Sequence, residues 1–336
     1  MRHQSERFLV LYCGGTIGMV ASEAGLVPNL DTVRQALAQY GQHLDLDFYA
    51  FSPLIDSSAI TLADMAALLA KIQQHWHEYV GFLVIHGTDT MAYTASVLAF
   101  ALAGADKPVV LTGSQKPLLA AVSDGPSNLQ QALAALTLPG FQGVGVVFDG
   151  QLLHGAAVKK TDAIAFNAFS SPNWPALAQY QAAGWQTGVL PPASGSLNLA
   201  VTLQPTAKVA TYVLTPGANS DYIGHSLQRD QPQAAVLLTY GNGNGPSTAS
   251  FIAAMATYVD QGGVLVNVSQ VNRGLVAPIY AQGSALSAAG AVAGGGLTLE
   301  ATWAKLTVGI SLGLAGPQLA AWFAADLLGE WAFGQG

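Results

Sequence analysis

Two threonines follow glycines at the ends of apolar runs, where a hydroxyl could serve as a nucleophile. Thr16 comes after the run Phe8–Cys13 and two glycines, and Thr88 with Asp89 follows the run GFLVIHG. A threonine hydroxyl is a weak nucleophile at neutral pH, so it needs a neighbouring base and N–H donors for the developing oxyanion. Glycine-flanked strand ends supply free N–H groups, and Asp89 can pair with an ammonium. The combination suits a small substrate that carries an α-amino group.

The glycines before Thr16 allow two other interpretations. One is a tight turn in which Thr16 only caps the following segment. The other is a nucleotide-binding fingerprint, which the spacing excludes because Gly14, Gly15 and Gly18 do not form G-x-G-x-x-G. On the residues alone, the tight turn and the chemical role both stay open.

The segments around these threonines alternate between strand and helix patterns. Apolar runs begin at residues 8, 44, 81, 107 and 143, and helical patterns begin at residues 31, 61, 92 and 127. Thr61 and Asp64 resemble a capping box at the start of a pattern that continues to Tyr79. This βαβ rhythm predicts a doubly wound, mostly parallel sheet with helices on both faces. Ligands of such sheets bind at the carboxyl ends of strands, which is where Thr16 and Thr88 stand.

The character of the chain changes near Leu190, where a stretch rich in Pro and Ser lacks a helical period. We interpret residues 190–208 as a linker between an N-terminal catalytic α/β domain, residues 1–189, and a C-terminal α/β domain, residues 209–336. Apolar runs near residues 209, 234 and 262 alternate with helical patterns in the second unit. The expected fold class is α/β, with a larger N-terminal doubly wound domain and a smaller C-terminal domain.

The composition limits the classes of function. Of the 336 residues, 51% are hydrophobic and 9% are charged, and the net charge is −7. Without a basic run, no nucleic-acid partner is expected. The charge-free stretches Leu275–Leu299 and Leu306–Ala325 are interrupted by polar residues and glycines, so we expect buried helices and no membrane span. The single cysteine, Cys13, excludes an intrachain disulfide, and the N-terminal run has the pattern of a strand, which together favour the cytoplasm.

The chain resembles the bacterial type I, cytosolic L-asparaginase family in seven blocks that occur in order along nearly its whole length. GGTI together with HGTDT, with DSS between them, is the specific part of this resemblance. It implies hydrolysis of L-asparagine to L-aspartate and ammonia through a β-aspartyl-threonine intermediate, with no metal and no cofactor. The blocks are CGGTIGM, PLIDSSAIT, GFLVIHGTDTMAYTAS, KPVVLTGSQKPL, SDGPSNL, VNVSQ and TLEATWAKL.

The resemblance also implies catalytic roles for individual residues. Thr16 matches the family's nucleophile. Thr88, Asp89 and Lys160 match a second cluster, in which the ammonium would stabilise negative charge on Thr88 or on an attacking water. Lys160 is identified through the segment LLHGAAVKKTD, and taken alone it would be a surface lysine. Lys116 in TGSQKPL is a rival for the same role.

Substrate-binding residues follow from the same resemblance. The stretch that holds the substrate's α-carboxylate and α-amino groups is matched by Asp56, Ser57 and Ser58. The N–H groups of Gly87 and Thr88 are candidate donors to the oxyanion. Asn244, in a glycine-rich loop, is implied to reach an active site across a subunit interface.

The chain departs from the family at the lid that closes over the nucleophile. Many relatives carry a tyrosine there, and this chain has Leu26. The type I family offers another tyrosine from its C-terminal domain, which is matched here by Tyr280. We hypothesise that Tyr280 approaches Thr16 across the interface of a homodimer or homotetramer, and the alternative is a turn tyrosine packed on its own domain. The apolar composition fits large subunit interfaces.

Other functions compete with the leading hypothesis. A glutaminase-asparaginase of broader specificity differs by one methylene in the substrate, which is worth only about 1–3 kcal/mol of discrimination. An amidase domain that serves a transferase is disfavoured by the chain length. A non-catalytic amino-acid-binding protein would keep the Asp-Ser and Thr-Asp contacts but would not need two threonines and a lysine. Ammonia release from asparagine and from glutamine separates these possibilities.

Overall fold

The apolar runs of the first half form an eight-stranded sheet. A computed structural model describes residues 6–23, 25–190, 196–276 and 281–332. The strand order is β12-β11-β8-β7-β6-β5-β1-β4, with parallel pairing from β4 to β7 and antiparallel pairing beyond it. The bounds are β1 Arg7–Tyr12, β4 Asp45–Ala50, β5 Gly81–Ile85, β6 Pro108–Thr112, β7 Gly143–Phe148, β8 Gln151–His154, β11 Ala178–Gln181 and β12 Gly184–Thr187.

The parallel part of this sheet confirms the predicted fold class. Its antiparallel edge was not predicted, because β8, β11 and β12 have only four residues each and show no extended period. Trp185 of β12 stands opposite Tyr180 of β11, and their rings meet edge to face with centroids 5.2 Å apart. A cross-strand aromatic pair of this kind stabilises a short edge that has little backbone pairing of its own.

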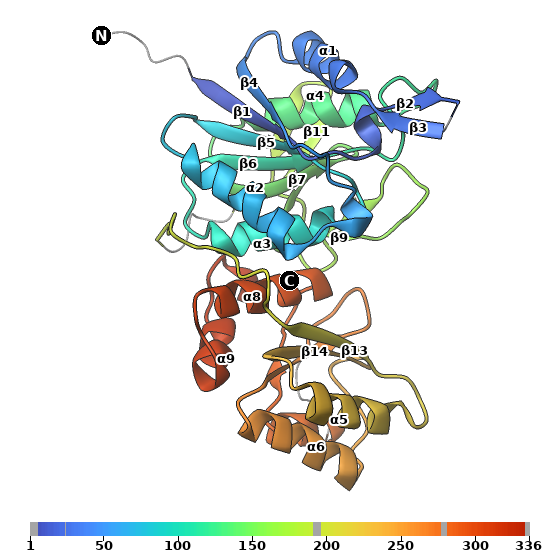
Figure 1. The fold of residues 1–336 in the computed structure, drawn as a ribbon, viewed down its shortest axis with the longest axis vertical. Helices are drawn as coiled ribbons and strands as arrows, with labels where there is room; N and C mark the ends of the chain where they lie inside the picture. The colour runs from blue at the N-terminus through green and yellow to red at the C-terminus, as the bar shows by residue number, and fades with distance from the viewer. Residues whose placement is uncertain (1–5, 24, 191–195, 277–280, 333–336) are drawn as a thin grey trace.

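Helices cover both faces of the sheet, so its strands are buried on both sides (Figure 1). Along β1, Val10 and Tyr12 contribute to the core beneath α1 and α4, whereas Leu9 and Leu11 contribute to the core beneath α2 and α3. This alternation is the period-two pattern of a strand. Both kinds of position are apolar, which is why the run FLVLYC is continuous. The bounds are α1 Leu30–Tyr40, α2 Leu62–Gln74, α3 Met91–Ala101 and α4 Gly125–Ala135.

The helix α2 begins as predicted and ends earlier than predicted. The Asp64 amide donates to Thr61 Oγ1 at 3.2 Å and the Thr61 amide donates to Asp64 Oδ2 at 2.8 Å, which is a complete capping box. The helix stops at Gln74 and not at Tyr79. Lys107 Nζ donates to the carbonyls of Trp76 and Tyr79, so a distant lysine satisfies backbone acceptors in the turns that follow the helix.

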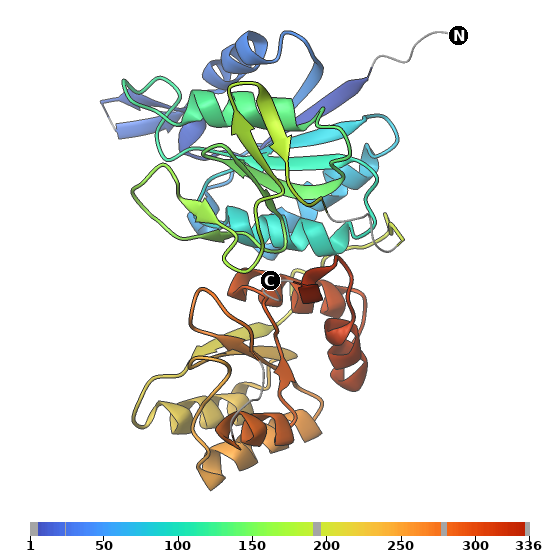
Figure 2. The ribbon, with the colours of Figure 1, turned by 180° about the vertical axis from the view of Figure 1, so that it is seen from behind.

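The helix α3 is buried on nearly every side, with ten of its eleven residues inaccessible. One side packs on the sheet, and the other packs on α8 (Leu299–Ser311) from the C-terminal domain. Tyr93 of α3 and Trp303 of α8 meet edge to face with centroids 5.5 Å apart. A single apolar cluster therefore extends through both domains. Figure 2 shows the same junction from behind.

A four-stranded parallel sheet in the order β13-β14-β15-β16 organises the C-terminal domain, which is the smaller unit that the sequence predicted. The helices α5 and α6 cover one face, and α8 and α9 cover the other. The bounds are β13 Val209–Val213, β14 Ala234–Thr239, β15 Val264–Ser269, β16 Val292–Ala293, α5 Asn219–Asp230, α6 Ala249–Asp260, α7 Ala281–Ala288 and α9 Gly316–Ala324. The remaining strands, β2 Met19–Ser22, β3 Gly25–Pro28, β9 Lys159–Lys160 and β10 Phe169–Ser170, form two short hairpins outside these sheets.

The apolar stretch near the end of the chain is divided between two helices. The helix α8 ends at Ser311 and α9 begins at Gly316, so the charge-free segment Leu306–Ala325 is not one helix. Within the described ranges, no helix combines the length and apolarity needed to cross a membrane. The apolar side chains of α8 are instead used in the contact between the domains.

Candidate active site

A cavity of about 330 Å³ lies at the carboxyl ends of β1 and β5. This is the edge where ligands of parallel sheets bind, and the volume suits a small molecule. Seven of the residues expected at the site line it, as do residues of the hairpin β2–β3. The lining consists of Gly14, Gly15, Thr16, Met19, Pro28, Leu54, Ile55, Asp56, Ser57, Gly87, Thr88, Asp89, Gln115, Lys160 and Ala163.

Two glycines bring the ends of β1 and β5 into backbone contact. Gly15 has φ of 100°, and a Cβ built there would lie 2.6 Å from the Gly87 Cα. No side chain fits at that distance, and the left-handed φ also favours glycine. This contact explains why the strand stops in glycines: it allows Thr16, which opens a 3₁₀ turn over residues 16–18, to line the same cavity as Thr88.

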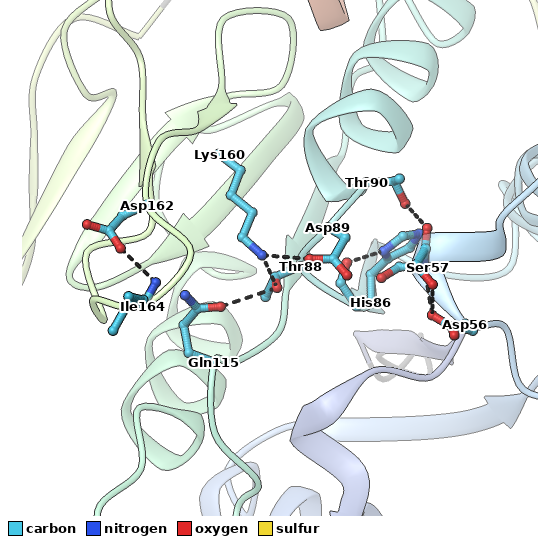
Figure 3. A network of polar contacts seen from close by, with 12 residues as sticks. Asp56, Ser57, His86, Thr88, Asp89, Thr90, Gln115, Lys160, Asp162 and Ile164 are labelled. Carbon is cyan, nitrogen blue, oxygen red and sulfur yellow. Dashed lines mark hydrogen bonds and ion pairs between the residues drawn. The ribbon is translucent and has the colours of Figure 1, made fainter.

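Lys160 joins the second threonine to the neighbouring carboxylate (Figure 3). Its Nζ lies 2.8 Å from Thr88 Oγ1 and 2.8 Å from Asp89 Oδ1. The side chain of Lys160 is 18% exposed and that of Asp89 is 58% exposed. Lys160 reaches this position from the short strand β9, where it pairs with Phe169 of β10. A cation held against a hydroxyl in a cavity can stabilise negative charge that develops on an oxygen there.

The segment after Ile55 forms the wall opposite Lys160. Asp56 Oδ1 accepts hydrogen bonds from the amide and from the hydroxyl of Ser58, both at 2.9 Å. Ser57 is buried, and its Oγ lies against Gly87, where a Cβ would approach within 2.3 Å. Asp56 and Ser57 therefore line the cavity, while Ser58 acts on Asp56 and is not among the lining residues.

His86 lies directly behind the cavity and was not singled out in the sequence. Its Nδ1 is 2.7 Å from the Gly87 carbonyl oxygen, and its Nε2 is 3.1 Å from Thr94 Oγ1. A carbonyl oxygen only accepts, so Nδ1 carries the proton. Burial lowers the pKa of His86, which keeps the ring neutral. The hydrogen bond holds the Gly87 carbonyl toward the core, and the trans peptide directs the Thr88 N–H the opposite way.

Gln115 is a second lining residue that the sequence did not indicate. Its Oε1 accepts from Thr88 Oγ1 at 3.3 Å, and its Nε2 donates to the Ala165 carbonyl at 3.3 Å. The neighbouring Lys116 was the rival candidate for the catalytic role of Lys160. Lys116 is exposed and is not among the lining residues. The signal for Gln115 was its place in the same block, TGSQKPL, after an apolar strand.

Asn244, an expected substrate-binding residue, is not among the described residues that line the cavity. Asn244 lies in the C-terminal domain, where its backbone pairs with Tyr240 after β14. Tyr280 lies outside the described residues. Leu26 stands on β3, 51% exposed and opposite Ala21, on the hairpin whose base lines the cavity. Among the described residues, none forms a hydrogen bond with the Thr16 hydroxyl, and no group of three or more His, Cys, Asp or Glu could hold a metal ion.

Comparison with known proteins identifies both domains. The family model described as Asparaginase, N-terminal matches residues 7–188, and the Glutaminase/Asparaginase C-terminal domain matches residues 208–323. The chain is 38% identical over 312 residues to L-asparaginase 1 of Escherichia coli strain K12, covering 90% of this chain and 91% of that protein. Among solved structures, L-asparaginase I of Vibrio cholerae O1 biovar eltor superposes with a TM-score of 0.88 at 32% identity, covering 97% of this chain and 99% of that one. The thermostable L-asparaginase of Thermococcus kodakarensis superposes with a TM-score of 0.85 at 28% identity, covering 96% and 98%.

Proposed function

Because this chain belongs to the asparaginase family, we propose that it hydrolyses L-asparagine to L-aspartate and ammonia. Its similarity to L-asparaginase 1 extends over 90% of the chain, so both domains of that enzyme have counterparts here. One observation carries the proposal: Thr16 and the Lys160–Thr88–Asp89 cluster line the same cavity, although they come from distant segments. A binding protein for amino acids would not need a hydroxyl nucleophile opposite a second hydroxyl and an ammonium.

In the first half of the proposed reaction, Thr16 Oγ attacks the side-chain amide carbon of asparagine. The new C–O bond forms an ester as the C–N bond breaks, and the leaving nitrogen gains the Thr16 proton and departs as ammonia. The oxyanion that forms on the way needs N–H donors. The Thr88 N–H is suited to this role, because His86 holds the preceding carbonyl on the opposite side of the peptide.

In the second half, water cleaves the β-aspartyl ester. The water oxygen bonds to the carbonyl carbon, the bond to Thr16 Oγ breaks, and Thr16 regains a proton. Thr88 accepts a hydrogen bond from the attacking water, and Lys160 stabilises the charge that develops on the two oxygens. Asp56 and Ser57 bind the α-amino and α-carboxylate groups of the substrate, and Asp89 faces the α-amino group while it is paired with Lys160.

The test of this proposal uses purified protein and two substrates. We expect ammonia release from L-asparagine, and the parallel assay with L-glutamine measures how narrow the specificity is. The Thr16→Ala variant should fold and bind L-aspartate but lose almost all hydrolysis. Full activity in a folded Thr16→Ala protein that binds aspartate would remove Thr16 from the mechanism.

We extend the proposal to a homodimer or homotetramer that acts in the cytoplasm, with Tyr280 approaching Thr16 from the C-terminal domain of an adjacent subunit. Exposed large apolar side chains support an assembly: Ile164 is 87% exposed, and Leu119 and Val122 are each 72% exposed. Sedimentation would measure the oligomeric state. Wild-type turnover in Tyr280→Phe would remove this tyrosine from the mechanism.

A further inference from the structure

Four groups form a chain of hydrogen bonds across the back of the cavity. Lys160 Nζ donates to Thr88 Oγ1 at 2.8 Å, and Thr88 Oγ1 donates to Gln115 Oε1 at 3.3 Å (Figure 3). Gln115 Nε2 then donates to the Ala165 carbonyl at 3.3 Å. The cluster proposed for catalysis therefore continues beyond Thr88 to a neutral amide.

The donor and acceptor roles along this series of hydrogen bonds are fixed at both of its ends. The ammonium of Lys160 has only protons to donate, so Thr88 Oγ1 accepts from it. The Ala165 carbonyl has no proton, so the side of the Gln115 amide that faces it is the NH₂ group. The other side, which faces Thr88, is then the carbonyl oxygen, and the Thr88 hydroxyl proton points to Gln115.

The backbone of Gln115 is held by a buried carboxylate. Asp124 is 4% exposed, and it accepts from the Gln115 amide at 2.8 Å and from the Lys116 amide at 3.0 Å. Asn128 donates to the same carboxylate at 3.2 Å and to the Gly113 carbonyl at 3.0 Å. These bonds fix the segment after β6 at the start of α4, so the Gln115 side chain leaves from a rigid base.

We propose that Gln115 is a positioning residue that sets the direction of the Thr88 hydroxyl. A hydroxyl has one proton and two lone pairs. With the proton directed to Gln115 and one lone pair taken by Lys160, the second lone pair is left for the cavity. Thr88 then accepts a hydrogen bond from the attacking hydroxyl or water and does not compete with it as a donor. This inference rests on the proposed function, because it assigns Gln115 a role in the same hydrolysis.

Loss of the Gln115 acceptor has a definite consequence. The Thr88 hydroxyl would rotate toward another acceptor, and the remaining acceptor of the cluster is the Asp89 carboxylate, which is paired with the same Lys160 ammonium. In that orientation the lone pair that faces the cavity is lost, although Lys160 and Asp89 stay in place. The chemical step should slow, whereas substrate binding through Asp56 and Ser57 should be little changed.

The experiment compares substitutions that separate the two hydrogen bonds of the Gln115 side chain, which accepts from Thr88 Oγ1 and donates to the Ala165 carbonyl. Gln115→Leu removes both hydrogen bonds, and Gln115→Met does the same with an unbranched side chain if the leucine variant does not fold. Gln115→Glu keeps an acceptor for Thr88 but, when ionised, has no proton for the Ala165 carbonyl. Lys116→Met is the matched control, because it changes the adjacent, exposed side chain of the same segment.

We expect kcat of Gln115→Leu to fall about tenfold or more, the size of one neutral hydrogen bond, with KM close to that of the wild type. Gln115→Glu should recover most of this rate, because a carboxyl oxygen accepts from Thr88 Oγ1 in either protonation state, and in acid the carboxyl O–H can donate to the Ala165 carbonyl as the amide does. A role in holding the 161–168 loop alone predicts the opposite near neutral pH: Gln115→Glu would be as slow as Gln115→Leu, because the ionised carboxylate has no proton for the Ala165 carbonyl. Wild-type kcat in Gln115→Leu, or no recovery in Gln115→Glu, would overturn the inference.

The same assays distinguish failure of the proposed function from failure of the role assigned to Gln115. Ammonia release by the wild type and by Lys116→Met establishes the assay before the Gln115 variants are compared. A wild type that does not release ammonia from asparagine would overturn the proposed function and this inference with it. An active wild type together with a fully active Gln115→Leu chain would overturn the role of Gln115 alone.

Discussion

Two lysine–carboxylate pairs among the described residues lie in opposite surroundings. Lys160 and Asp89 meet at the cavity, where both side chains are reached by solvent and a hydroxyl shares the ammonium. Lys305 and Glu330 meet where neither side chain is exposed. There the ammonium also donates to the Ala325 carbonyl at 2.7 Å, and the carboxylate accepts from the amides of residues 327 and 328.

The surroundings decide what each pair can do. Four aromatic rings lie around Lys305, with centroids 5.2–6.0 Å from its ammonium: Phe100, Trp322, Phe323 and Trp331. Burial lowers the pKa of Lys305 and raises that of Glu330, so each charge depends on the other. Both charged groups have protein partners, because the ammonium donates to two acceptors and the carboxylate accepts from three donors. The Lys160 ammonium retains access to a ligand.

Removing Lys160 gives the largest expected effect. Lys160→Met should lower kcat about a thousandfold, the size of a missing proton-transfer or charge-stabilising group, and should weaken binding of aspartate much less. The free energy of unfolding should change by less than about 1 kcal/mol, because the pair is partly exposed. Steady-state kinetics measure kcat and urea unfolding measures the free energy of unfolding, with Lys116→Met as the control. A severe Lys116→Met phenotype beside a normal Lys160→Met enzyme would reverse the assignment.

Removing Lys305 should give the inverse pattern. Lys305→Met leaves Glu330 as a buried carboxylate without its counter-charge, and the cost of breaking such a pair is about 3–5 kcal/mol. The activity per folded molecule should be unchanged, because Lys305 lies outside the cavity. Thermal unfolding combined with titration of active sites separates the two quantities. If turnover of the folded protein fell as well, the division between the two pairs would be wrong.

In contrast to the two charged pairs, the buried side chain of His154 is kept neutral by its surroundings. Burial lowers the pKa of His154 to about 4, whereas an unfolded chain would have the ordinary value near 6.5. Above pH 6.5 both states are neutral, and between pH 6.5 and 4 only the unfolded state gains the proton. The free energy of unfolding should therefore fall as the pH decreases through this range, by about 3 kcal/mol from His154. Unfolding curves from pH 7 to 4 test this, and His154→Gln should show a shallower dependence; an equal slope would exclude His154 as the source.

The smallest effect is expected when both members of the buried pair are neutralised. Lys305→Met combined with Glu330→Gln keeps an acceptor for the amides of residues 327 and 328 but removes both charges of the pair. The free energy of unfolding should return to within about 1–2 kcal/mol of the wild type. A double variant as unstable as Lys305→Met would show that the lysine stabilises the fold through its contacts with the aromatic rings and not through its charge.

Local patterns in the sequence predicted most of the fold. The continuous apolar runs became the central parallel strands, and Thr61 with Asp64 became a capping box, because these features depend on neighbouring residues alone. The turns that follow α2 are stabilised by Lys107, some thirty residues away, and no local pattern indicates this contact. The four-residue strands of the antiparallel edge are stabilised by cross-strand partners such as Trp185 and Tyr180, which the sequence does not place together.

The candidate site likewise contains residues that the sequence predicted and residues that depend on contacts between distant segments. Thr16, Thr88 and Asp89 follow strand ends and were expected to meet, and Lys160 was expected through the resemblance; the structure places all four around one cavity. Their catalytic roles stay predictions. His86 and Gln115 were missed because their positions matter through hydrogen bonds to the Gly87 carbonyl and the Thr88 hydroxyl, which arise only when distant segments are packed.

The burial of α3 on both sides has a consequence for how the protein is made. The sheet beneath α3 can form early, but α8, which covers its other side, is synthesised about two hundred residues later. At roughly 5–20 residues per second, ribosomes need about ten to forty seconds to bridge that interval. Throughout it, the nascent chain presents an uncovered apolar helix to the cell. Overexpressed chains that stop short of α8 should therefore be collected by chaperones or accumulate in inclusion bodies.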